Sequence, residues 1–138
     1  ESSAASDVYK RQDRLGEMSR DVTHFAFPNH PEKQEDHYNN VTNLGGMLVL
    51  VLKTDPRQRQ NRENFFAMGA YAQNLMLLLH EQGIGTCWKT PPYIFEPKVR
   101  KVFGVHGDEV IAGFLYLTDL EEVPPKALRK NKHLISKY

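Results

Sequence analysis

The sequence lacks several features that would define a protein class at once. Its 138 residues contain one cysteine, Cys87, and the 18 basic and 17 acidic side chains leave a net charge of +1. A single cysteine excludes an internal disulfide and fits a reducing cytoplasm. A near-neutral charge gives no general reason to expect nucleic acid or an anionic membrane as a partner.

Long apolar runs and metal-binding patterns are missing as well. No stretch approaches the roughly 20 apolar residues that span a bilayer, so we expect no membrane segment. The N-terminus has no apolar core of the kind found in signal peptides. The 6 histidines are scattered and share no coordination spacing with other ligands, so we predict no metal site. What remains is the composition of one globular, cytoplasmic domain.

The two ends of the chain differ from its middle. Residues 1–12 read ESSAASDVYKRQ, have no apolar period and resemble a translated sequencing adapter. We therefore expect residues 1–12 to be non-native and residues 13–122 to form one domain that is incomplete at its N-terminus. Residues 123–138 are predicted to be a basic arm. The arm leaves open a third hypothesis, an RNA-binding module, although a solvated tail or an arm on a partner subunit fits it better.

Helix and strand patterns alternate along the domain. We predict helices over residues 13–19, from Pro31 up to Gly45, and over residues 63–82 and 96–103. Continuous apolar runs at residues 47–52 and 109–117 predict buried strands. Buried strands linked by helices indicate an α+β fold, with a mixed sheet packed around a long central helix.

The long helix over residues 63–82 gives the strongest structural signal. Its apolar residues spread around nearly the whole circumference, which is typical of a helix inside a core or between subunits. These residues are Phe65, Phe66, Met68, Tyr71, Leu75, Met76, Leu78 and Leu79. Asn61 is expected to cap its start, and Gly83 to adopt the left-handed conformation past its end.

The segment that follows this helix, QGIGTCWKT, carries the strongest functional signal. It predicts a glycine turn and a short strand that ends in an aromatic ring, a cation and a hydroxyl, namely Trp88, Lys89 and Thr90. Such a triplet suits a flat, anionic ligand. The pattern alone favours a simpler interpretation, in which Trp88 belongs to the core and Lys89 is solvated. Cys87, in an apolar strand, is expected to be a buried and inert thiol.

The order of these motifs resembles the FMN-dependent nitroreductases, and within them the small single-domain branch of NAD(P)H nitroreductases. The resemblance covers residues 63–122, from GAYAQNLMLLLHEQGIGTCWKT through EPKVRKVFGV to EVIAGFLYL. It implies an α/β sandwich, a homodimer and FMN at the dimer interface. The triplet Trp88, Lys89 and Thr90 matches the residues that contact FMN. The segment associated with NAD(P)H matches Leu78, Leu79, His80, Glu81, Gln82 and Gly83.

Two departures from the family pattern concern the cofactor. The base in the triplet is usually arginine and here is Lys89, which keeps the charge but loses the bidentate fork for phosphate. The family's N-terminal arginine-arginine-serine motif and its proline-rich loop, which hold the FMN phosphate and the flavin edge, are not in this sequence. We expect that an authentic N-terminal portion is missing.

The resemblance implies hydride transfer from NAD(P)H to flavin, followed by reduction of a nitroaromatic, quinone-like or related small molecule. The cofactor performs this chemistry, so no catalytic side chain is nominated. A second hypothesis is a non-enzymatic flavin-binding protein, or an inactive fragment of the enzyme.

Overall fold

A computed structural model describes the backbone of residues 4–9 and 12–121, and the side chains of residues 17–121. Its centre is a four-stranded sheet in the order β1-β2-β4-β3 within these residues. The strands are β1 (Ala4–Tyr9), β2 (Gly46–Lys53), β3 (Ile84–Lys89) and β4 (Glu109–Asp119). Every neighbouring pair is antiparallel, so the α+β class is confirmed while the expected mixed sheet is wrong.

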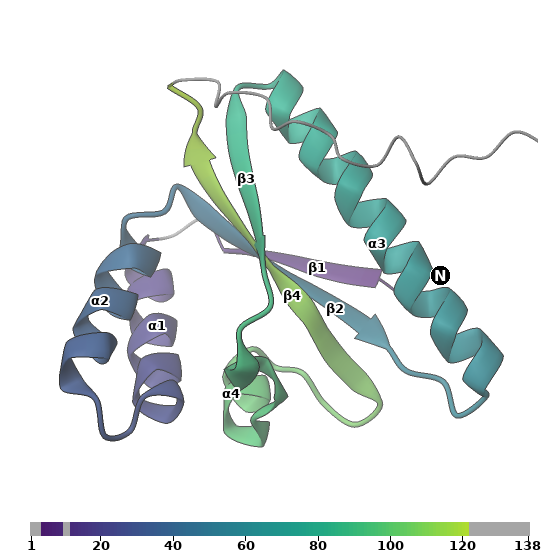
Figure 1. Cartoon of the computed structure of the whole chain (residues 1–138), viewed down its shortest axis with the longest axis horizontal. Helices are drawn as coiled ribbons and strands as arrows, with labels where there is room; N and C mark the ends of the chain where they lie inside the picture. The colour runs from purple at the N-terminus through teal and green to yellow at the C-terminus, as the bar shows by residue number, and fades with distance from the viewer. Residues whose placement is uncertain (1–3, 10–11, 122–138) are drawn as a thin grey trace, which may run out of the picture.

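Both faces of the sheet are covered by helices (Figure 1). One face carries α1 (Gln12–Ala26), α2 (Pro31–Thr42), the short 3-10 helix η1 (Pro92–Phe95) and α4 (Pro97–Val102). We call it the α1 face. The opposite face, the α3 face, is covered by α3 (Gln58–Glu81).

The apolar run of β2 explains why two cores form on one sheet. Successive side chains of a strand point to opposite faces. Met47, Val49 and Val51 therefore join the α1-face core, which also contains Val22, Tyr93, Val99, Phe103 and Phe114. Leu48, Leu50 and Leu52 join the α3-face core with Met68, Ala72 and Leu115. The predicted burial of both strand faces is confirmed, since seven of the eight β2 residues are buried.

The long helix α3 differs from its prediction in two respects. It begins at Gln58, five residues before the predicted start at residue 63, and its N-cap residue Arg57 makes no side-chain capping bond. Asn61 does not cap the helix; its side chain accepts a hydrogen bond from the backbone N–H of Asp55 at 3.1 Å. The prediction failed because Asn61 stabilises the preceding turn instead.

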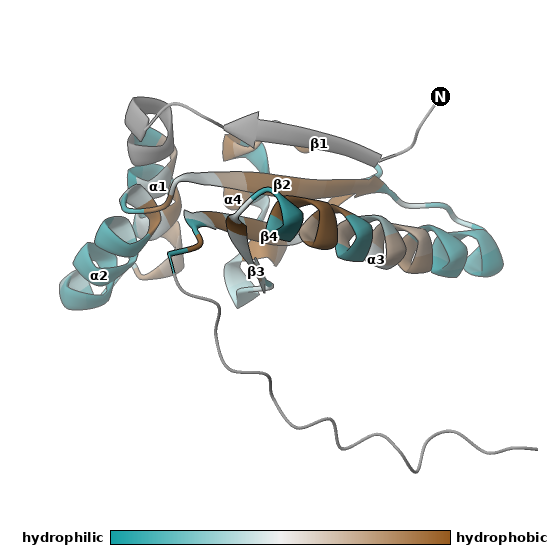
Figure 2. Cartoon of the chain, turned by 90° about the horizontal axis from the view of Figure 1, so that it is seen from above, coloured by the Kyte–Doolittle hydropathy of each residue, from teal (hydrophilic) through white to brown (hydrophobic). Residues whose placement is uncertain are grey.

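Helix α3 lies on one face of the sheet and is not enclosed. Only its inner stripe is buried, at Met68 and Ala72. On its outer side, Phe66 is 70% exposed, Leu77 58% and Leu78 61%. Figure 2 shows hydrophobic colour along the middle of α3 and hydrophilic colour along α2. The expectation of a helix that is apolar all round is therefore met in composition but not in burial within one chain.

The other elements lie close to their predicted places. Helix α1 is longer than expected, Pro31 is the first residue of α2, and α4 and β4 fall where the sequence places them. Gly83 follows α3 with a φ of 75°, as the predicted left-handed cap requires.

Candidate functional site

The predicted FMN triplet lies where β3 ends. Lys89 is the last residue of the strand, and Thr90 begins the connection to η1. In register, Trp88 lies opposite Leu115, and Lys89 lies opposite Phe114. Because directly opposed residues share a face, Trp88 points to the α3 face and Lys89 to the α1 face. The triplet therefore presents side chains to both faces at the end of the edge strand. We call Trp88, Lys89 and Thr90 together the rim.

Burial within the triplet fits a ligand site at that rim. Trp88 is half-buried and packs against the α3-face core, while Lys89 and Thr90 are exposed. Within the described residues, no carboxylate lies within ion-pair distance of Lys89. Among the described strands, β3 pairs with β4 alone, so its outer backbone groups have no strand partner there. As far as residues 4–9 and 12–121 show, an unpaired cation, an aromatic ring and an open strand edge are therefore adjacent.

The segment matched to NAD(P)H binding lies elsewhere in the same chain. Leu78 to Glu81 form the last turn of α3, and Gly83 connects it to the start of β3. Leu79 is half-buried, and the other five residues are exposed. A strand rises about 3.3 Å per residue, so Gly83 and Thr90 are separated by roughly 20 Å along β3. The two predicted segments thus lie at opposite ends of one strand (Figure 1).

Two further residues of β3 bear on this site, and the expectation for one of them, Cys87, is wrong. Cys87 is exposed, although a buried thiol was expected; the strand is at the sheet edge, where α1-face cover is incomplete. Gly85 does not offer open backbone to a ligand, because a Cβ there would lie 2.9 Å from the hydroxyl of Thr118. Its missing side chain makes room for β4 rather than for a cofactor.

A series of hydrogen-bonded side chains, which we call the polar chain, crosses the α1 face, and the sequence analysis did not predict it. His37 on α2 hydrogen-bonds through Nδ1 to Thr23 Oγ1 at 2.6 Å and through Nε2 to the Tyr93 hydroxyl at 2.8 Å. Thr23 and Tyr93 are buried, and His37 is half-buried. A proton on Nδ1 makes Tyr93 the donor to Nε2; the other tautomer reverses both bonds. This polar chain joins α1, α2 and η1, which lies in the connection that follows Thr90.

Burial sets the protonation of this chain. It lowers the pKa of His37, which favours the neutral imidazole. Burial, reinforced by the neighbouring phenol of Tyr116, raises the pKa of Tyr93 far above its ordinary value, so the phenol keeps its proton. Burial also raises the pKa of Tyr116. These groups therefore act as neutral hydrogen-bonding anchors rather than as charges.

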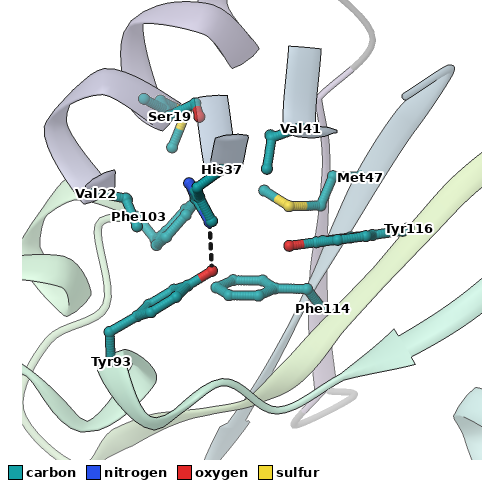
Figure 3. A pocket seen from close by; sticks show the side chains of 10 residues that line it. Ser19, Val22, His37, Val41, Met47, Tyr93, Phe103, Phe114 and Tyr116 are labelled. Carbon is teal, nitrogen blue, oxygen red and sulfur yellow. Dashed lines mark hydrogen bonds between the residues drawn. The ribbon is translucent and has the colours of Figure 1, made fainter. Parts of the chain in front are cut away.

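Figure 3 shows His37, Tyr93 and Tyr116 converging on a small cavity between the α1 face helices and the sheet. Its volume is about 10 Å³, which is room for one water molecule at most. None of Trp88, Lys89 and Thr90 lines it. This cavity is too small to hold a flavin. The rim at the end of β3 is the candidate cofactor site because its residues match the triplet that contacts FMN in the family it resembles.

Residues 4–9 and 12–121 contain no group of three or more His, Cys, Asp or Glu side chains placed to hold a metal ion. No helix among them is long and apolar enough to cross a bilayer.

Comparison with known proteins assigns this architecture to a class. The model of the nitroreductase family matches residues 4–117. The chain belongs to the nitroreductase family, which confirms the family predicted from the motifs.

Individual relatives agree with that assignment. The chain is 30% identical over 93 residues to a Bacillus subtilis (strain 168) protein named putative NAD(P)H nitroreductase YfhC, covering 67% of this chain and 48% of that protein. It therefore spans about half the length of the curated relative it matches.

Solved structures show the same fold at lower identity. A nitroreductase-like family protein from Bacillus cereus superposes with a TM-score of 0.78 at 22% identity, over 98% of this chain and 73% of that one. A nitroreductase from Bacteroides fragilis, solved with bound FMN, gives 0.69 at 13% identity, over 98% of this chain and 76% of that one. At these identities the likeness establishes the fold.

Proposed function

We propose that this chain is an FMN-dependent oxidoreductase that passes hydride from NAD(P)H, through the flavin, to nitroaromatic, quinone-like or related small molecules. The observation that carries the proposal is the Trp88–Lys89–Thr90 rim, at the end of the edge strand in a chain of the nitroreductase family. Names of relatives support it: one is a putative NAD(P)H nitroreductase, and another was solved with FMN.

The rim fits the chemical needs of FMN. The ammonium group of Lys89 is exposed and free of carboxylate partners among the described residues, so it can balance a phosphate. Thr90 adds an exposed hydroxyl donor. The half-buried indole of Trp88 offers a flat apolar surface for a ring system. When bound, FMN supplies the hydride and electron transfer itself.

We also propose that the working unit is a homodimer in the cytoplasm. Helix α3 exposes Phe65, Phe66, Leu77 and Leu78, and a group of exposed apolar side chains of this kind commonly marks a protein contact. The NAD(P)H segment, residues 78–83, and the FMN rim lie at opposite ends of β3. A second copy packed against α3 could bring residues 78–83 of one subunit to the rim of the other, which a single chain cannot do.

Flavin binding and turnover test the proposal separately. The 138-residue chain is titrated with FMN, and the reconstituted protein is then assayed for NADH and NADPH oxidation with menadione or nitrofurazone. We expect a saturable yellow complex and acceptor-dependent oxidation. Flavin binding without turnover would support the alternative, a non-enzymatic flavin-binding protein. No retention of FMN would refute the cofactor assignment.

A charge reversal tests the rim itself. Lys89→Glu places a carboxylate against the phosphate, and we expect FMN affinity to fall at least about tenfold, as for removal of a charge-assisted contact. Lys101→Glu makes the same charge change at an exposed position on α4 and serves as the control. Equal FMN affinities for Lys89→Glu and the parent chain would remove Lys89 from the site.

A further inference from the structure

Gly113 on β4 lies directly beneath the rim. It opposes Leu50 of β2, and it is two residues from Leu115, the partner of Trp88. A Cβ built on Gly113 would overlap Trp88 Nε1, and it would lie 3.0 Å from both Trp88 Cδ1 and the backbone oxygen of Lys89. The indole of Trp88 therefore occupies the space that any other residue at position 113 would need.

The strand geometry explains why this contact forms. Leu115 and Leu50 both belong to the α3-face core, so Gly113, two residues before Leu115, presents its backbone to the same face. An irregularity in the β2–β4 register falls between Leu50 and Val51, beside Gly113. Glycine in a strand next to such an irregularity commonly marks a close approach of other atoms to the backbone.

We infer that Gly113 is a positioning residue for the proposed flavin rim, because its lack of a side chain seats the indole of Trp88 on β4 and holds the backbone of Lys89 close to that strand. The inference rests on the proposed function. It assigns to β4 a share in shaping the site, although Gly113 itself need not touch the cofactor.

We call the close contact of the Trp88 indole with Gly113 the seat. A side chain at position 113 would change the positions of both Trp88 and Lys89. A side chain at position 113 would displace the indole and press on the carbonyl of Lys89, so both would move relative to Thr90. Overpacking of this kind forces side chains from their preferred rotamers and shifts the backbone. Loss of position at the rim should therefore weaken FMN binding without any change of charge.

Four proteins test the seat: the parent chain, Gly113→Ala, Trp88→Phe and the double variant. Each is titrated with FMN by flavin fluorescence and unfolded in urea. Trp88 is the single tryptophan of the chain, so its emission reports on the seat directly in the parent and in Gly113→Ala. Gly69→Ala on α3 is the control, because a Cβ there would meet nothing within 4 Å.

We expect Gly113→Ala to shift the Trp88 emission and to weaken FMN binding about tenfold, which is the scale of an overpacking penalty. Gly69→Ala should leave both unchanged. In the Trp88→Phe background, Gly113→Ala should cost clearly less FMN affinity than in the parent, because the indole nitrogen that the Cβ would overlap is gone and the 3.0 Å contact with the Lys89 backbone oxygen remains. Unchanged emission and affinity in Gly113→Ala, or equal losses in both backgrounds, would overturn the inference.

The inference is also tested if the Gly113→Ala variant does not fold. If Gly113→Ala is unfolded and the double variant folds, the indole is the obstacle and the inference stands. If neither folds, the cost does not come from Trp88 and the inference falls. Should the parent chain bind no FMN, the proposed function fails, while the Trp88 emission and the urea unfolding of the same proteins still decide whether Gly113 seats the indole.

Discussion

The two faces of the sheet are built from the same strands and stabilised in different ways. The α1 face is covered by several short helices, and its core includes a hydrogen-bonded chain from Thr23 through His37 to Tyr93. The α3 face is covered by one long helix and has an aliphatic core around Leu50 and Leu115. Both faces leave apolar side chains exposed, but the α1 face does so mainly at Phe95 of η1, whereas the α3 face does so at several positions along one helix, including Phe66, Leu77 and Leu78.

This difference assigns different roles to the two faces. A face whose covering helix exposes further apolar residues is suited to a second layer of protein. A face tied together by buried polar side chains has one arrangement in which every bond is made. The α1 face therefore holds the connection after Thr90 in place, and the exposed apolar residues of α3 support the proposal that the α3 face meets a partner subunit. The proposed flavin rim is where these two faces meet.

The largest expected effect comes from truncating neighbouring core residues on opposite faces. Phe114 and Leu115 are 1% and 0% exposed. Phe114→Ala should lower the free energy of unfolding by about 3–5 kcal/mol and Leu115→Ala by about 2–5 kcal/mol. Lys101→Ala, on the surface of α4, should stay within about 0.5 kcal/mol. Urea unfolding measures all three; a negligible loss for Leu115→Ala would mean that α3 does not pack on the sheet as described.

Next in size is the effect of a charge on the outer side of α3. Leu77 is 58% exposed in one chain, and Leu77→Glu should weaken self-association at least about tenfold if that side is the subunit contact. Asn39→Glu, at an exposed position of α2, introduces the same charge on the other face. Sedimentation equilibrium compares the two variants. A parent chain that remains monomeric, or equal dissociation constants for both variants, would contradict the proposed division of roles.

A smaller loss of unfolding free energy is expected on removal of a buried hydroxyl, and it should exceed the loss on removal of an exposed hydroxyl. Tyr93→Phe removes the partner of His37 Nε2, and should cost about 1–3 kcal/mol because a buried polar group loses its bond. Tyr38→Phe removes a hydroxyl that accepts a bond from Arg20 at 3.1 Å on the surface, and should cost within about 0.5 kcal/mol. If the two substitutions are equally mild in urea unfolding, the polar chain does not stabilise the α1 face.

Prediction from sequence succeeded where one interaction dominates. The strand β2 is buried on both faces except at Lys53, and β4 is buried on both faces around Gly113, Phe114 and Leu115; continuous apolar runs in the sequence predict this. Gly83 acts through its freedom to adopt a positive φ and Pro31 through its fixed φ, and both properties depend little on tertiary context. The family and the α+β class were likewise predictable, because motif order along residues 63–122 preserves the order of elements.

Prediction failed where the deciding partner is distant in sequence. His37 lies in a polar helix, and nothing local marks it as the link between Thr23 and Tyr93, which is 56 positions away. The exposure of Cys87 depends on β3 being at the sheet edge, and strand order is not written in the strand itself. The role of Gly113 depends on where the indole of Trp88 lies. The FMN and NAD(P)H residues themselves remain predictions.

The smallest expected effect is the pH dependence of stability, to which a buried histidine on the α1 face contributes. Burial lowers the pKa of His37 in the folded chain below its ordinary value of 6.5. The unfolded chain then binds more protons than the folded chain as pH falls below 6.5, so protonation favours unfolding. The contribution of neutral His37 is complete above pH 6.5, and it is lost from there down to the lowered pKa. The α3-face core has no comparable group among its members.

His37→Gln makes this prediction measurable. The slope of the unfolding free energy against pH from a single proton cannot exceed about 1.4 kcal/mol per pH unit. We expect the parent chain to lose stability with such a positive slope just below pH 6.5, and the His37→Gln variant to lose less over the same interval. Parallel pH curves for the two proteins would show that His37 is not held neutral by burial, and that the polar chain on the α1 face is open to water.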